Sequence, residues 1–350
     1  MDTLTQGIIW WALFTLTTKK YTVKHFILWW LIANIPDLDV FIGPLVYSHP
    51  IDQLFFHRWI THSLIWWSTI ALLVGFILSL IERKRTLQDI VRTLLASFLA
   101  IFGGHLLIDR LTSYGMRWWF PRSWVTSSVD TIFIIDLGMW ILLFLLFIWY
   151  CLSRRRALAS LGIVVGAGAY IALCIFFKSI ASNQIIDHFN QQFPAQKMIS
   201  SITMPEPLQP FLRRGLIKTS SGYYQWRYSI FDNPSESVFF QKTPLWVDSQ
   251  VLLSAVTWDE NHRLQKILSF TRWYELISSW ASWYSIDNLI FGSFNGWDET
   301  TSKQRMFSFE LIDHKLIRAE DWSRRSFSSI NWNLFWLRVR GKHASIVPNK

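Results

Sequence analysis

The stretch SLIWWSTIALLVGFILSLI, residues 63–81, contains no Asp, Glu, Lys or Arg. A helix that crosses a bilayer needs about 20 mostly apolar residues, since hydrocarbon offers no partner to unpaired backbone groups. Further stretches of this kind occupy residues 25–43, 90–109, 131–151 and 157–178. The sequence therefore predicts an α-helical, polytopic membrane domain in the first half of the chain.

One more apolar run, from Leu4 to Leu16, is short for a crossing and favours a tilted, thinned or re-entrant segment. With it, the domain has about six helices. Basic residues cluster at every second connection between the runs: Lys19, Lys20 and Lys24, then Arg83 to Arg85, then Arg154 to Arg156. Because cytoplasmic loops are enriched in Lys and Arg, we expect a multi-pass protein of a bacterial inner membrane. Both termini, and the C-terminal half with them, are then on the outer face.

The composition excludes several other classes of protein. In 350 residues, 51% are hydrophobic and 17% are charged, which suits two domains of unlike character. The net charge is +10, but many of the basic residues sit in short clusters next to the apolar runs, which indicates membrane orientation and not nucleic-acid binding. The two cysteines, Cys151 and Cys174, fall near opposite ends of neighbouring runs, so neither a disulfide nor a redox pair is expected. The N-terminus lacks the pattern of a cleaved secretory signal and is expected to be retained.

The chain becomes polar after Lys178 and then rich in proline. We predict a membrane-embedded helical domain over 1–178, a linker over 179–210 and a small soluble α+β domain over 211–350. That domain is expected to cover the membrane site or to select its substrate. Aromatic and β-branched residues predict strands in this last domain at Tyr223–Phe231, Ser237–Phe240, Leu289–Phe294 and Leu334–Val339.

Residues 263–284 place apolar side chains at nearly helical spacing and predict an amphipathic helix. Its indole rings, Trp273, Trp280 and Trp283, leave two interpretations open. The helix either rests on the outer leaflet, where indoles favour the interface, or is buried against the sheet of its own domain.

Histidine and aspartate recur at the predicted outer ends of the apolar runs: Asp37, Asp39, His57, His62, His105 and Asp109. Ionisable groups at membrane depth are expensive, so each is a candidate functional residue. His105 and Asp109 are four residues apart, which puts them on one helix face where two side chains can hold a single ion. Imidazole with carboxylate suits zinc, and also manganese or iron, while the lack of nearby cysteine argues against a structural zinc–thiolate site.

Each of these residues also has an ordinary structural interpretation. Asp37 and Asp39 point to different sides of a helix, so only one is expected to be a direct ligand, and either can instead end a helix. His57 can simply lie at the membrane interface, and His105 with Asp109 can form a hydrogen-bonded pair. Ser63 is placed to cap the following helix. Ser113 favours a turn, and Asp136 is a packed carboxyl or a metal ligand.

These segments, in this order, carry a resemblance. Together with the opening Met1-Asp2-Thr3-Leu4-Thr5, with Thr112-Ser113-Tyr114-Gly115 and with Asp130 and Ile134-Ile135-Asp136, they resemble the YdjM-like inner-membrane proteins, regarded as metal-dependent hydrolases. That family is distantly similar to the zinc-dependent phospholipase C group. The resemblance implies one metal site made by Asp37 or Asp39 with His62, His105 and Asp109. The family usually has histidine as its sixth residue, whereas this chain has Gln6. A weakened, mononuclear or inactive site is the expected consequence.

The sequence and the resemblance together predict a membrane-bound metal-dependent hydrolase. In it, a metal-activated water attacks a lipid or lipid-linked (phospho)ester at the outer face of the membrane. The predicted catalytic residues are Asp37, Asp39 and His57. The predicted metal is divalent, with zinc as the leading candidate, and its predicted ligands are Asp37, Asp39, His62, His105 and Asp109. The alternative is a non-enzymatic envelope or stress protein with a structural or degenerate metal site. A transporter is disfavoured because no inverted repeat is evident.

Overall fold

In the computed structural model, the chain forms two compact units. The first comprises Met1–Ile175 with Pro207–Gln209, and the second comprises Phe176–Glu206 with Pro210–Lys350. The residues that the structure describes are 2–18, 27, 30–32, 34–57, 61–84, 86–123, 125–233, 241–244, 252, 256–272, 274–280, 283–290, 308–312, 315–318 and 332–342.

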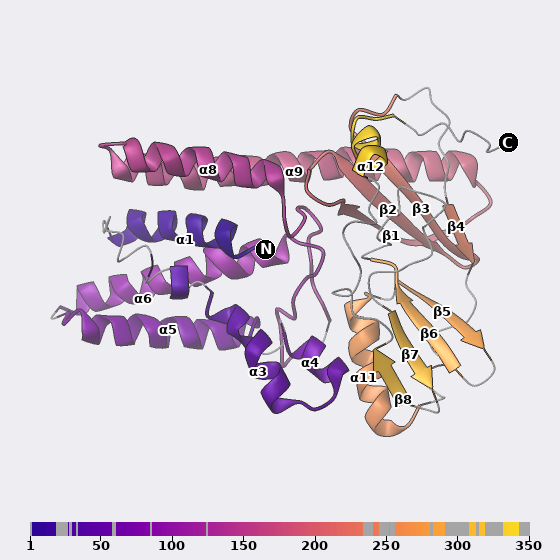
Figure 1. Ribbon diagram of the computed structural model, residues 1–350, viewed down its shortest axis with the longest axis horizontal. Coiled ribbons are helices and arrows are strands. Elements are labelled where there is room, and N and C mark those ends of the chain that lie inside the picture. The colour runs from indigo at the N-terminus through magenta and orange to yellow at the C-terminus, as the bar shows by residue number, and fades with distance from the viewer. Residues whose placement is uncertain are drawn as a thin grey trace. The chain divides into compact units, whose positions relative to one another are not determined.

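The first unit is helical (Figure 1). Its elements are α1 (Thr3–Thr18), the 3-10 turn η1 (Pro36–Leu38), α3 (Asp39–Val46), α4 (Pro50–Phe56), α5 (Leu64–Ile81), α6 (Leu87–Ile101), the π-helical turn η2 (Phe102–Leu106), α7 (Leu107–Arg110), α8 (Leu137–Leu152) and the beginning of α9 (Arg156–Gln192). Among the described residues, three helices are long and apolar enough to cross a membrane, namely Leu64–Ile81, Leu87–Arg110 and Arg156–Gln192. The prediction of an apolar helical domain is confirmed, whereas six crossings remain a prediction.

Helix α1 occupies the interior of this unit, between α6 and α8 (Figure 1). One side of α1 packs through Trp10 and Phe14 against residues of α5 and α6, and the other packs through Trp11 against α8 and α9. A helix that is apolar all round is expected to be buried on all sides. Helix α1 therefore lies in the interior of the unit, packed against α5, α6, α8 and α9.

Two predicted spans differ from the observed helices. The run 131–151 is helical only from Leu137, because the Asp136 carboxylate accepts the backbone N–H of Met139 at 3.0 Å and so caps the start of α8. In the run 25–43, the described residues do not form one continuous helix, since a turn at residues 34–35 precedes η1 and α3. Pro36 begins η1, as expected for a residue that cannot continue a preceding helix.

The second unit contains two antiparallel sheets (Figure 1). The first has the order β1-β2-β3-β4, formed by Met198–Pro205, Leu212–Thr219, Gly222–Ser229 and Gln241–Pro244. The second has the order β5-β6-β7-β8, formed by Glu275–Trp280, Trp283–Asn288, Ser308–Ile312 and Lys315–Arg318. Helices α11 (Trp258–Phe270) and α12 (Trp332–Val339) and the part of α9 from Phe176 onward also belong to this unit.

The polar stretch that was predicted as a linker, residues 179–210, contains the end of α9 and the whole of β1. Ile185 and Phe189 of α9 pack with Tyr224 and Trp226 of β3 in one apolar cluster. This part of α9 is polar on one face only, so its composition resembles a linker although its other face covers a sheet.

Two predicted elements of the second unit are wrong. The helix predicted over 263–284 ends at Phe270, after which Arg272 adopts a positive φ of 51° and β5 and β6 follow. Trp280 and Trp283 therefore lie in strands, so no interfacial helix carries them. The strand predicted over Leu334–Val339 is helix α12, whose Phe335 and Val339 bury one face against Leu212.

The other strand predictions of this unit have mixed outcomes. The strand predicted at Tyr223–Phe231 is β3. Ser237–Phe240 and most of Leu289–Phe294 lie outside the described residues.

Candidate metal centre

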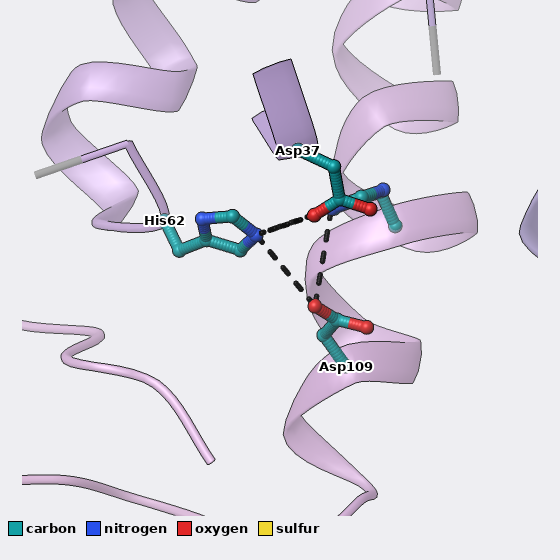
Figure 2. Close-up of side chains that lie close together, drawn as sticks. Asp37, His62 and Asp109 are labelled. Atoms are coloured by element: carbon teal, nitrogen blue, oxygen red, sulfur yellow. Dashed lines mark hydrogen bonds and ion pairs between the residues drawn. The ribbon is translucent and has the colours of Figure 1, made fainter. Parts of the chain in front are cut away.

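Four side chains from segments far apart in the sequence converge in the first unit: Asp37, His62, His105 and Asp109. One ligand-type atom from each lies within 4.8 Å of the others. Figure 2 shows Asp37, His62 and Asp109 pointing toward a common point. The side chains of His62, His105 and Asp109 are fully buried, and that of Asp37 is 27% exposed. Such an arrangement of two imidazoles and two carboxylates is able to hold a divalent cation.

The distances within this cluster suit a shared ion better than direct hydrogen bonds. His62 Nε2 lies 3.3 Å from His105 Nε2, 3.4 Å from Asp37 Oδ1 and 3.6 Å from Asp109 Oδ2. His105 Nε2 lies 3.6 Å from Asp37 Oδ1 and 3.9 Å from Asp109 Oδ2. N–H···O bonds usually span about 2.7–3.2 Å. Around a tetrahedral zinc with bonds of about 2.0–2.1 Å, neighbouring ligand atoms are about 3.3–3.4 Å apart.

Asp37 and Asp39 reach different partners, although only one residue separates them. Asp37 lies in the 3-10 turn η1 and joins the cluster, whereas Asp39 begins α3 and is 1% exposed. Asp39 Oδ1 is 2.6 Å from His57 Nδ1, and Asp39 Oδ2 accepts the hydroxyl proton of Thr61. Asp39 therefore lies beside the cluster, and Asp37 alone of the two faces the other three ligands.

His62 is fixed by the start of α5. Ser63 caps this helix by accepting the N–H of Trp66 at 3.4 Å, so the predicted cap is confirmed. The N–H of Leu64 donates to the carbonyl of Trp118 at 3.0 Å, which holds the segment against the loop after α7. His62 thus enters the cluster from just outside a helix long enough to span a membrane.

His105 and Asp109 lie where α6 changes its geometry. His105 belongs to the π-helical turn η2 and Asp109 to α7. Such turns within α-helices occur frequently at functional sites. A Cβ at Gly104 would be 2.2 Å from Cδ1 of Trp10, so glycine at this position lets α1 approach the ligand-bearing turn closely.

The His62 ring is suited to bind a metal at neutral pH. Burial lowers the pKa of His62 to about 4, against the opposing effect of the Asp37 carboxylate. The ring is therefore neutral near pH 7, which metal coordination requires. Its Nδ1 faces Thr61 Oγ1 at 3.1 Å and Asp39 Oδ2 at 3.6 Å. Contacts of this kind fix the orientation of a ligating histidine, and sequence reasoning had given Thr61 no role.

Gln6 touches the cluster through a metal-ligand candidate. Its Nε2 donates to Asp109 Oδ1 at 2.7 Å, and its side chain is fully buried. Its Oε1 is buried and has no hydrogen-bond partner among the described residues. Gln6 thus holds one carboxylate oxygen of Asp109 while the other oxygen faces His62 and His105. The residue that the sequence marks as a defect is placed to orient a ligand.

The remaining candidates are not among the four converging residues. Asp136 caps α8 and accepts the hydroxyl of Tyr170 at 2.5 Å, so it is a packed carboxyl. Ser113 lies in a turn. Asp130, with a positive φ of 51°, accepts a hydrogen bond from Ser128 at 3.0 Å. His57 is half-buried, with its ring centroid 5.4 Å from that of His62.

Comparison with known proteins gives a family for the half of the chain that carries this cluster. No significant match was found among proteins of curated function or among solved structures, so the likeness to the zinc-dependent phospholipase C group stays a prediction. The sequence model of the YdjM inner membrane protein family matches residues 1–183, which include every residue of the cluster. The chain therefore belongs to the YdjM inner membrane protein family.

Proposed function

We propose that this protein is a membrane-bound, metal-dependent hydrolase that cleaves a lipid or lipid-linked (phospho)ester at the outer face of the inner membrane. The observation that carries the proposal is the convergence of Asp37, His62, His105 and Asp109 on one point. Imidazoles and carboxylates are the donors that zinc, manganese and iron share in hydrolytic sites.

The position of the cluster along the helices supports a substrate from the membrane. His62 lies just before the span Leu64–Ile81, and Asp109 lies at the end of the span Leu87–Arg110. If both helices cross the bilayer, the two ligands lie at the same interface, since a helix of 18 residues is about 27 Å long. Ester and phosphoester groups of lipids are found at that depth. The basic residues at the other ends of these helices support an outward-facing site.

The proposed roles follow from the contacts of each side chain. Asp37, His62, His105 and Asp109 would hold the ion, and an ion held there supplies activation of water and polarisation of an ester oxygen. Asp39 orients His57 through Nδ1 at 2.6 Å. In the proposed reaction, the opposite ring nitrogen of His57 would accept a proton from water and return one to the leaving group. The side chain of His57 is 22% exposed, as a residue that exchanges protons with substrate needs to be.

A structural metal is the second candidate function. It is favoured by the complete burial of His62, His105 and Asp109, since structural sites are closed by protein ligands. In that case the ion would fasten η1, the start of α5 and α7 together without chemistry. The partial exposure of Asp37 favours an accessible site instead.

Two measurements on the full chain in lipid nanodiscs test the proposal. Elemental analysis is expected to find about one transition-metal ion per chain in the wild type and none in His105→Ala. His49→Ala is the matched control, because His49 caps α4 and lies outside the cluster. Absence of metal from the wild-type protein would remove the basis of the proposal.

The second measurement separates the hydrolase from the structural metal. Wild-type protein is tested against phospholipids and polyprenyl phosphoesters in the same nanodiscs, and His57→Ala is expected to keep its metal but lose at least about 100-fold in hydrolysis. A wild type that binds metal and cleaves none of these esters, with His57→Ala unchanged in metal content and stability, would support the structural alternative.

A further inference from the structure

Helix α3, next to the proposed active site, presents an apolar face that no other described part of the first unit covers. Its inner side packs on α4, where a Cβ at Gly43 would lie 3.2 Å from Cδ1 of Phe56. Its outer side exposes large apolar residues, of which Phe41 is 72% and Leu45 is 85% exposed. We call the following residues the α3 face: Leu38, Val40, Phe41, Ile42, Leu45 and Val46.

The α3 face is too apolar to be stable in contact with water. The only charged residue of α3, Asp39, is buried, so the exposed side carries no charged group. Contiguous apolar patches on a protein surface mark contacts with another protein, a ligand or a membrane. With 8 residues, α3 is about 12 Å long and cannot cross hydrocarbon of about 30 Å. A helix of this length and character is suited to lie at the edge of the apolar layer.

Aromatic residues near His62 locate that edge. Trp66 and Trp119 are both exposed, and the hydrogen bond from Leu64 N–H to the Trp118 carbonyl keeps their two segments together. Exposed indoles gather at the membrane–water interface. The interface is therefore expected at the level of His62, close to the residues that precede α3.

The α3 face is continuous with the accessible side of the cluster. Asp37, the one ligand of the four with an exposed side chain, directly precedes Leu38 of the face. His57, also partly exposed, contacts Asp39 at the first turn of α3. An amphiphile lying against α3 would thus present its head group at Asp37 and His57 while its chains remain in an apolar setting.

We propose that the α3 face contacts the acyl chains of bilayer lipid and guides an amphiphilic substrate, by its chains, to Asp37. Contact between the α3 face and lipid does not depend on catalysis. Guidance of a substrate rests on the proposed hydrolase function, and it implies a substrate with long apolar chains that stay in the bilayer during the reaction.

Spin labels attached to single cysteines test whether the α3 face contacts lipid, in nanodiscs of phosphatidylethanolamine and phosphatidylglycerol. In a Cys151→Ser/Cys174→Ala background, labels are placed by Phe41→Cys and Leu45→Cys, with Leu73→Cys on the exposed side of α5 as lipid reference and Ser220→Cys in a strand turn as aqueous reference. The labels at 41 and 45 are expected to collide with oxygen more than with a water-soluble nickel chelate, as at position 73. Labels that meet the chelate as at position 220, or that meet neither reagent because a protein covers them, would overturn the proposal.

Hydrolytic activity tests whether the α3 face guides the substrate. Phe41→Ser/Leu45→Ser is expected to keep its metal and to lose at least about tenfold in hydrolysis of a bilayer-embedded ester, because the burial of two large apolar side chains is removed. The matched control is Leu80→Ser/Ile81→Ser, which changes exposed apolar residues at the other end of α5 and should retain activity. Equal activity of the two double variants contradicts substrate guidance. Failure of the wild type to hydrolyse any ester defeats the proposed function, while the spin-label result still decides whether lipid covers α3.

Discussion

The two units of this protein bury ionisable side chains in opposite ways. In the second unit, Glu206 lies 3.3 Å from Nε of Arg214 and 2.9 Å from Nε of Arg227, and Arg214 also donates to the Leu289 carbonyl at 2.8 Å. Positive and negative groups are matched there within the protein. In the first unit, two carboxylates and two imidazoles gather at distances too long for most hydrogen bonds.

This difference separates a network that is matched within the chain from a cluster that is able to hold a metal ion. A buried charge is stable only when it is paired or coordinates a metal. Arg214 finds its partners in the surrounding sheet, so its network holds a fold together. The group around His62 has the donors and the spacing to hold a cation. Substitutions in both units and removal of the metal test this contrast.

Arg214→Met should strongly destabilise the second unit, because Glu206 would lose one of its two cationic partners in a buried place. Removing one partner of a buried ion pair costs about 3–5 kcal/mol. Hydrogen exchange of peptides from β1 to β3 is expected to accelerate, while metal content stays at the wild-type value. Lys218→Met, on the same strand, is the control with little expected effect. Metal loss in Arg214→Met would break the contrast.

Metal removal should act on the first unit alone. A ligand present at about 1,000 times its Kd stabilises the folded state by about 4 kcal/mol, so chelation withdraws stability of that order. Hydrogen exchange should increase in peptides that contain Asp37, His62 and Asp109, and strands β1 to β3 should exchange as before. A uniform response of both units, or none in either, would contradict the contrast.

Gln6→Leu should weaken metal binding without abolishing it. The substitution keeps a side chain of similar size but removes the N–H that holds Asp109 Oδ1 at 2.7 Å. Loss of a group that orients a metal ligand typically lowers affinity by about 10–100-fold. Chelator competition on the purified protein measures this change, with the exposed Gln88→Leu as control. An unchanged metal affinity would mean that Gln6 only fills space beside Asp109 and does not orient it.

Ser63→Ala should have the smallest effect. It removes the cap of α5, worth about 1 kcal/mol, and leaves the four ligands in place. Denaturation of the first unit should shift slightly, with metal stoichiometry unchanged. Ser68→Ala serves as comparison, because the Ser68 hydroxyl donates to a carbonyl within the helix and caps nothing. A large loss of metal here would show that the helix start, more than the ligands, controls the site.

Much of the helical unit follows from local pattern. Apolar length predicted α5 and the helix that ends at Arg110, and the spacing of His105 and Asp109 predicted that both face one way. These features depend on residues close in sequence, for which helix geometry alone decides the outcome. The choice between Asp37 and Asp39 was left open, since it depends on the 3-10 turn that separates them.

Contacts between distant segments could not be read from the sequence. Gln6 reaches Asp109 across 103 positions, and only the packing of α1 against Gly104 brings the two together. In the second unit, strand pairing overrides the helical spacing of residues beyond Phe270. Conversely, α12 has the composition of a strand, yet Phe335 and Val339 are one helical turn apart and bury the same face.

Helices α6 and α7 are continuous through the π-helical turn η2. Because of this turn, the direction in which α7 points its side chains is set independently of that of α6. Ahead of it, α6 must present Leu94 and Ser97 to Gly75 of α5. Beyond it, Asp109 must face His62. An α-helix turns about 100° per residue, and a π turn takes up one residue more than an α turn, so the phases before and after η2 are separate. Deletion of one residue between Ser97 and His105 would rotate His105 and Asp109 together about the helix axis by about 100°. The contact of α6 with α5 at Gly75 would be unchanged.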